Sequence, residues 1–127
     1  MPRKKSVVLT DHELRLMEVL WRKGAATVSA VTAALPPPPL AYNTVLSTMR
    51  TLEQKGYVSH EEAGRAFLYR PAIERTDAAK SAVAHLLARF FGNSANSLAV
   101  ALLDEVPMNA ADRKRVRELL ERKDRKK

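Results

Sequence analysis

A chain of 127 residues, 46% of them hydrophobic, can bury the core of one domain or of a small domain with an appendage. Its formal net charge of +8 favours a polyanionic partner such as nucleic acid, although a basic protein without such a partner can have the same composition. The sequence has no cysteine, which excludes disulfides, thiolate metal sites and cysteine nucleophiles. It has no run of about 18 apolar residues, and its basic start lacks an apolar core of signal-peptide length, so a cytoplasmic protein without a membrane span is expected.

The first predicted elements are a loose basic arm over residues 1–9 and a helix over residues 10–23. Thr10 and Glu13 have the spacing of a capping box, in which each side chain accepts a hydrogen bond from the other residue's backbone N–H. Gly24 ends the helix. Its apolar positions repeat at helical spacing and predict a buried stripe of Leu14, Met17, Leu20 and Trp21.

A second, shorter helix is expected over residues 27–35, with Thr27 as its N-cap. Four consecutive prolines follow at positions 36–39, and they cannot continue a helix. They predict a stiff, extended connection. A ligand for a proline-binding module is the alternative interpretation, and the shortness of the run favours the simple connection.

The next predicted helix ends at Lys55, before Gly56, and has two contrasting faces. Its apolar face consists of Val45, Leu46, Met49 and Leu52. Its polar face consists of Asn43, Thr44, Ser47, Thr51 and Gln54, with Arg50 at the edge. Such short side chains are mediocre helix formers, but they let a helix enter a major groove and can contact base edges. An ordinary amphipathic helix with an unremarkable polar face is the alternative.

Alternating residues after Gly56 predict a hairpin with strands over residues 57–60 and 65–69 and a turn over residues 61–64. Three aromatic side chains are expected to pack the hairpin onto the helices, namely Tyr57, Phe67 and Tyr69. Arg65 is placed to reach a phosphate or the minor groove, although a solvated hairpin charge is common and two neighbouring glutamates reduce the positive field. A helix with a face of short polar side chains, followed directly by a basic hairpin, predicts a winged helix-turn-helix domain over residues 1–74.

Three amphipathic helices are predicted in the remainder, over residues 76–91, 94–105 and 110–123, before a charged tail. They are too short and too few to close a generous core, so residues 75–127 are expected to form a helical dimerisation domain. The alternative is that they pack back on their own winged domain. The residues expected in the dimer interface are Leu86, Phe90, Leu98, Leu102, Val116, Leu119 and Leu120.

The segment LAYNTVLSTMRTLEQKGYVSHEEAGRAFLYRP at residues 40–71 closely resembles the signature of the penicillinase repressor family, which includes the BlaI/MecI group and the copper-responsive CopY group. The pattern LT-x-x-E-x-x-x-M-x-x-L-W over residues 9–21 is similar to that family's first helix. NSLAVALLDE at residues 96–105 is similar to its C-terminal half. The resemblance covers about residues 7–122.

The resemblance implies a homodimeric repressor that binds inverted-repeat operators in double-stranded DNA and is released on induction. In members that respond to β-lactams, it implies a sensor-linked protease as a further partner that cleaves the dimerisation domain. Together with the helical wheel, it predicts that DNA is contacted by Thr27, Tyr42, Asn43, Thr44, Ser47, Thr48, Arg50, Thr51 and Arg65.

Three features of the sequence depart from the family pattern. Ala101 and Leu102 stand where the antibiotic-resistance members have the cleaved Asn-Phe bond. The absence of cysteine excludes the metal motif of the copper-responsive members. The proline run replaces a connection that is usually polar.

Other functional classes have less support. His12, His60 and His85 have no acid or nucleophile at a recognisable spacing, and no glycine-rich phosphate loop or metal motif is present, so neither an enzyme nor a cofactor is expected. A winged-helix adaptor that binds protein rather than DNA is the second hypothesis. An adaptor would more often carry apolar residues over positions 43–51.

Overall fold

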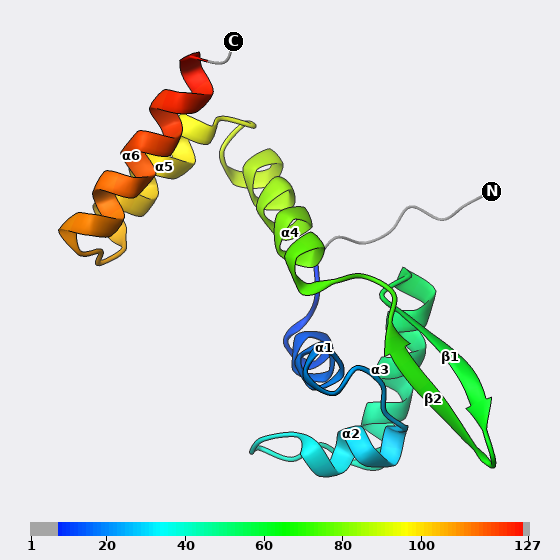
Figure 1. Ribbon diagram of the computed structural model, residues 1–127. Coiled ribbons are helices and arrows are strands. Elements are labelled where there is room, and N and C mark those ends of the chain that lie inside the picture. The colour runs from blue at the N-terminus through cyan, green and yellow to red at the C-terminus, as the bar shows by residue number, and fades with distance from the viewer. Residues whose placement is uncertain (1–7, 126–127) are drawn as a thin grey trace, which may run out of the picture. The chain divides into compact units, whose positions relative to one another are not determined.

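Residues 8–125 of the chain are described by the computed structural model, with side chains to residue 122. They form six helices and one two-stranded antiparallel hairpin (Figure 1). The elements in chain order are α1 (Asp11–Lys23), α2 (Val28–Ala34), α3 (Tyr42–Lys55), β1 (Val58–Ala63), β2 (Ala66–Pro71), α4 (Arg75–Phe90), α5 (Ala95–Glu105) and α6 (Ala110–Arg125). The predicted fold class is confirmed. The predicted basic arm before Val8 and the end of the charged tail lie outside the described residues.

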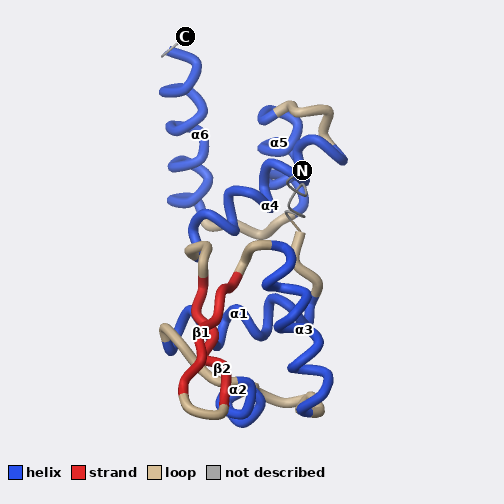
Figure 2. The backbone as a smooth tube through the Cα atoms, turned by 90° about the vertical axis from the view of Figure 1, so that its right-hand side faces the viewer, coloured by secondary structure: helices blue, strands red, loops and turns tan. Residues whose placement is uncertain are grey.

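The chain divides into two compact units, Met1–Ala82 and Val83–Lys127, so that α4 contributes to both. In the first unit, β2 contacts α1 and α2, while β1 contacts α3 (Figure 2). The hairpin therefore packs against all three helices of this unit.

The core of the first unit is built from the inner faces of α1, α2 and α3. As predicted, α3 buries Val45, Met49 and Leu52, and Leu46 packs at the edge of the core. Burying these side chains removes apolar surface from water and fixes α3 against the other helices. The other fully buried side chains include Leu16, Met17, Leu20, Val31 and Tyr69.

The predicted inner stripe of α1 is partly wrong. Met17 and Leu20 are buried, but Leu14 is 41% exposed and Trp21 is half-buried, while Leu16 and Val19 lie in the core. Leu14 and Trp21 lie on the flank of α1 and line a shallow apolar groove with the alanines at the start of α4. The Trp21 indole Nε1 donates to the Ile73 carbonyl at 2.9 Å, which explains why its ring stays at the edge of the core.

The predicted capping box of α1 is confirmed, and it extends into a tertiary contact. The Thr10 hydroxyl accepts from the Glu13 N–H at 3.2 Å, and the Glu13 carboxylate accepts from the Thr10 N–H at 2.9 Å. Lys55 Nζ, in the last turn of α3, lies 2.8 Å from the same carboxylate oxygen. Glu13 is only 4% exposed, so this contact joins the start of α1 to the end of α3 inside the fold.

The second unit leaves most of its apolar side chains accessible. Ala99 is the buried residue among its described positions. Within residues 8–125, no single helix is long and apolar enough to cross a membrane, although the sharply bent pair of α4 and α5 meets that length and composition together.

Candidate nucleic-acid interface

The connection between α2 and α3 is held by a side chain of α1. The proline run is non-helical, as predicted, and it is exposed to solvent. The Arg15 guanidinium donates to the Pro36 carbonyl at 2.6 Å and also to the Pro38 carbonyl. Because α1 is packed in the core, this contact ties the entry of α3 to the rigid part of the unit.

The outer face of α3 carries the predicted polar residues. Asn43, Ser47, Arg50 and Thr51 are exposed, together with Tyr42, whereas Thr44 and Thr48 are half-buried. Apart from Arg50 and the aromatic Tyr42, these exposed or half-buried side chains are short and polar, and a partner could approach the helix closely.

Three hydroxyl groups on this helix donate back to its own backbone. Ser47 and Thr48 donate to the Thr44 carbonyl at 3.2 and 2.7 Å, and Thr51 donates to the Ser47 carbonyl at 3.1 Å. The hydroxyl hydrogens are therefore used inside the helix, and the oxygens keep lone pairs that can accept from a partner. Asn43 and Arg50 add donor groups to the same helix.

The start of α2 lies beside the hairpin. The Thr27 hydroxyl accepts from the Ala30 N–H at 3.1 Å, which confirms Thr27 as the N-cap. One residue earlier, Ala26 exchanges two backbone hydrogen bonds with Tyr69, each 2.9 Å long. This bridge fixes the hairpin against the loop before α2.

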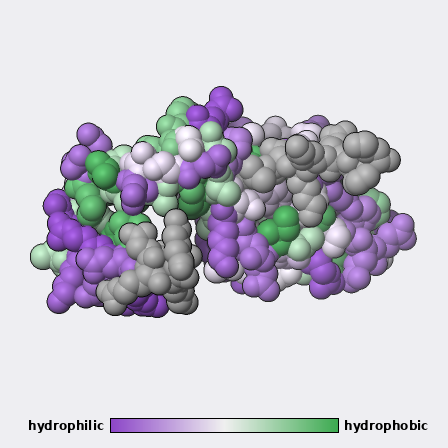
Figure 3. Space-filling model, turned by 90° about the horizontal axis from the view of Figure 1, so that it is seen from above, coloured by the Kyte–Doolittle hydropathy of each residue, from purple (hydrophilic) through white to green (hydrophobic). Residues whose placement is uncertain are grey.

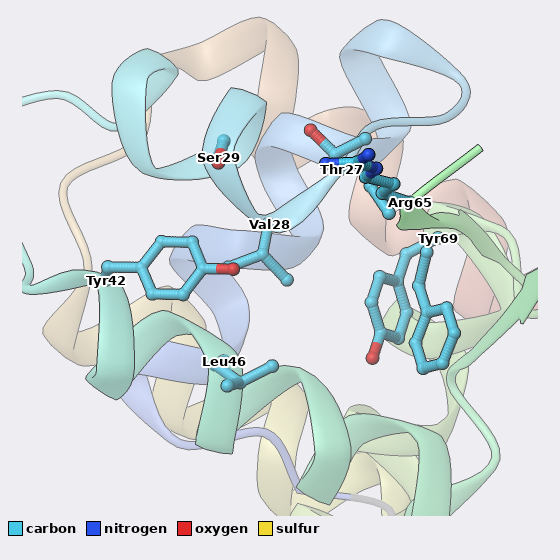
Figure 4. A pocket seen from close by; sticks show the side chains of 9 residues that line it. Thr27, Val28, Ser29, Tyr42, Leu46, Arg65 and Tyr69 are labelled. Carbon is cyan, nitrogen blue, oxygen red and sulfur yellow. The ribbon is translucent and has the colours of Figure 1, made fainter. Parts of the chain in front are cut away.

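A notch of about 220 Å³ lies where α2, α3 and the hairpin meet, and we call it the wing notch. Figure 4 shows Tyr42 of α3 pointing toward Val28 of α2, and Arg65 ending beside Thr27. Three of the predicted DNA-contacting residues, Thr27, Tyr42 and Arg65, thus share one surface feature. Its lining residues are Thr27, Val28, Ser29, Tyr42, Leu46, Arg65, Ala66, Phe67 and Tyr69.

The hairpin is longer than predicted and its turn is tighter. Ala63 pairs with Ala66, so the turn consists of Gly64 and Arg65, and the glutamates expected in the turn are strand residues. Gly64 has φ of +66°, a left-handed conformation that glycine adopts without steric cost. Arg65 is exposed at the tip, where a basic side chain can extend toward a partner.

Two of the three hairpin aromatic residues pack as predicted. Tyr57 and Tyr69 are buried against the helices, but Phe67 is 44% exposed. Phe67 shares the face of Tyr69 but lies two residues nearer the tip, and it stacks on the His60 ring with centroids 4.2 Å apart. Burial, with a smaller contribution from Glu53, raises the pKa of the Tyr69 phenol above its ordinary value.

His60 and Glu53 are site residues that the sequence analysis missed. Both carboxylate oxygens of Glu53, on α3, lie 2.8 Å from His60 Nδ1, on β1. A carboxylate only accepts, so the imidazole donates this hydrogen bond. The two residues are seven positions apart across a turn, and nothing in their local pattern indicates that they meet.

The predicted dimer residues form a second candidate interface in the other unit. Leu86, Phe90, Leu102 and Leu119 are exposed, and Leu98, Val116 and Leu120 are half-buried. On the face of the molecule that Figure 3 presents, hydrophobic and hydrophilic residues are mixed at the surface. Exposed apolar side chains of this size and number are typical of a surface that meets a partner.

No group of three potential metal-ligating side chains occurs in the part of the chain that the structure describes.

The sequence profile of the penicillinase repressor family matches residues 9–122. The penicillinase repressor of Bacillus licheniformis is 27% identical over 126 residues, which cover 98% of each chain. The solution structure of the DNA-binding domain of the repressor BlaI is 29% identical and matches 59% of this chain and 93% of that chain, with a TM-score of 0.52. A CopR repressor structure is 34% identical over 53% of this chain and 99% of that chain, with a TM-score of 0.46.

Proposed function

Because the chain belongs to the penicillinase repressor family, we propose that it is a repressor that binds double-stranded operator DNA through α3 and the hairpin. The observation that carries the proposal is the exposed face of short polar side chains on α3, together with the basic residue at the hairpin tip. The similarity to the DNA-binding domain of the repressor BlaI, which covers 59% of this chain, supports the same assignment.

In the proposed complex α3 enters the major groove. Asn43 and Arg50 supply donors to base edges or phosphates, and Thr44, Ser47, Thr48 and Thr51 supply acceptor oxygens or methyl groups. Thr27 and Tyr42 lie at the wing notch, where they would contact the sugar–phosphate backbone together with Arg65. Backbone contacts orient the protein, and base contacts select the sequence.

We propose further that residues 75–127 form a homodimer that presents two winged domains to an inverted repeat. A second copy is the natural occupant of the apolar surface of the second unit, since the same side chains would meet on both copies. Two half-sites held in one dimer gain affinity through effective concentration. Induced release then follows from any event that separates the copies, including the action of a sensor-linked protease.

The Ala101–Leu102 bond bears on how release is achieved. It lies inside α5, where the Leu102 carbonyl accepts from the Val106 N–H at 3.1 Å. The residue pair differs from the Asn-Phe bond of the antibiotic-resistance members, so we do not assign cleavage to this bond.

The proposed function is tested by titrating the purified protein against the duplex upstream of its own gene and against a scrambled duplex, at two salt concentrations. We expect a specific complex of dimer stoichiometry and a protected inverted repeat. Weak, salt-sensitive binding that is identical on both duplexes would contradict the proposal and support the adaptor hypothesis.

We expect Asn43→Ala to relax sequence discrimination. If the amide contacts one base, its loss costs about 1–3 kcal/mol on the operator and little on scrambled DNA. The measurement is the ratio of operator affinity to scrambled affinity. Asn96→Ala, an equivalent change at an exposed position of α5, is the matched control and should leave the ratio unchanged. Equal losses on both duplexes would assign Asn43 to phosphate contact instead.

A further inference from the structure

The distal part of the hairpin has few neighbours outside itself. Its side chains from Ser59 to Phe67 are exposed, while Val58 and Tyr69 at the base are buried. A two-stranded hairpin is only marginally stable alone, so its orientation relative to the helices depends on the contacts that its side chains make with them. The tip carries Arg65, and a small rotation about the base would move that side chain by several times the shift at the base.

Glu53 and His60 provide a side-chain contact between this hairpin and α3. The hydrogen bond is 2.8 Å to each carboxylate oxygen, and the two side chains are 35% and 30% exposed. Glu53 lies in the last turn of α3, and His60 lies opposite Tyr69 in the strand register. The contact therefore joins the last turn of α3 to strand β1, at the level where Ala26 bridges to Tyr69 on the opposite strand.

A row of rings continues from this contact toward the tip. The His60 ring is nearly parallel to Phe67 at 4.2 Å, and it is tilted against Tyr69 at 5.3 Å. Tyr69 is anchored in the core, and Phe67 lies two residues from Arg65. Fixing the His60 ring thus restrains both strands of the hairpin. By contrast, the Arg70–Glu61 ion pair joins the two strands only to each other.

We propose that Glu53 and His60 are positioning residues that set the direction of the hairpin relative to α3 and so aim Arg65 at the DNA backbone. The inference rests on the proposed function, since it assigns these residues a role in operator binding through Arg65. Neither side chain needs to touch DNA for this role.

Replacing the Glu53 carboxylate distinguishes a positioning role from a purely electrostatic effect on DNA binding. Removing a negative charge near a polyanion favours binding, so both Glu53→Ala and Glu61→Ala should tighten DNA binding if charge alone matters. If Glu53 positions the hairpin, Glu53→Ala weakens operator binding severalfold, while Glu61→Ala does not. Glu61 is the matched control because it is an ion-paired glutamate on the hairpin whose partner, Arg70, is also on the hairpin and not on α3.

A double-mutant cycle tests whether His60 acts through Arg65. We expect Arg65→Ala to weaken operator binding about tenfold and to lower the slope of log affinity against log salt by about 1. His60→Ala should weaken binding by a smaller factor and lower the slope in the same direction, and the double variant should resemble Arg65→Ala alone. His60→Asn, whose amide can replace Nδ1 as a donor to Glu53, should recover part of the affinity. Fully additive effects of His60→Ala and Arg65→Ala would overturn the proposal.

A measurement without DNA keeps the inference separate from the proposed function. The chain has no native cysteine, so spin labels at R22C and A63C report the distance between α1 and the distal hairpin in the full-length protein. We expect His60→Ala and Glu53→Ala to broaden this distance distribution and Glu61→Ala to leave it unchanged. Identical distributions in all variants would overturn the proposal, whereas failure of the wild type to prefer its operator would instead contradict the proposed function.

Discussion

Phe90→Asp is expected to convert the proposed dimer to a monomer and to weaken operator binding by roughly 10²–10⁴-fold, which is the usual contribution of effective concentration. Phe90 is 68% exposed on α4, and Leu86, one turn earlier, is 38% exposed. In a dimer these side chains would be buried, and a carboxylate among them would lose its hydration without a partner. Because Phe90 is exposed within the chain, the substitution should leave the chain's own helices intact.

Ala88→Asp is the matched control for this prediction. It adds the same charge to the same helix, but position 88 lies about 200° from position 90 around the helix axis. Sedimentation at micromolar concentration measures the oligomeric state, and titration with the operator duplex measures affinity. A Phe90→Asp variant that stays dimeric, or a monomer that binds as tightly as the wild type, would exclude this face as the interface. A monomeric wild type would favour packing of the C-terminal helices on the winged domain.

Glu13→Ala is expected to lower the free energy of unfolding of the winged domain by about 3 kcal/mol. The substitution removes the Glu13 half of the capping box and leaves the Thr10 N–H without its acceptor. It also leaves Lys55, whose side chain is 20% exposed, without the carboxylate 2.8 Å away. Removing one partner of a buried pair costs more than the pair contributes, because the remaining charge keeps its desolvation penalty.

Glu18→Ala tests whether this loss depends on burial. Glu18 lies on the same helix and forms an ion pair with Arg75 at 2.6 Å, but both side chains are exposed. Exposed pairs contribute about 0–1 kcal/mol, so this variant should unfold close to the wild type. Urea unfolding followed by circular dichroism measures both variants, with the slope m as a check that the transition is unchanged. Equal losses at positions 13 and 18 would contradict the prediction.

Local sequence signals predicted much of the candidate site. The spacing of Thr10 and Glu13 predicted a cap that the structure contains, and Thr27 capped α2 as expected. The period of the apolar residues placed Val45, Met49 and Leu52 inside and left the short polar residues of α3 outside. These features depend on neighbours within one or two helical turns, so periodicity and capping chemistry suffice to predict them.

Other features follow from contacts between distant residues. The exposure of Leu14 and the position of Trp21 depend on the path of the chain between the hairpin and the start of α4, which lies beside them. The exposure of Phe67 depends on how far the hairpin extends past the helices. A period-2 pattern does not define where two strands turn, so the Gly64–Arg65 turn was misplaced by the sequence analysis. The predicted DNA and dimer contacts stay predictions, because each of them needs a second molecule.

The amino-acid pattern alone predicts the six helices and the hairpin found in residues 8–125, the helix caps and the apolar face of α3, because each of these is specified by residues close together in the chain. That Thr27, Tyr42 and Arg65 line one notch, and that Glu53 meets His60, becomes visible only once the elements are packed together. Those contacts arise from the packing of α2, α3 and the hairpin around a shared core. The direction of a packed element depends on all of its buried neighbours together, and no short segment encodes it.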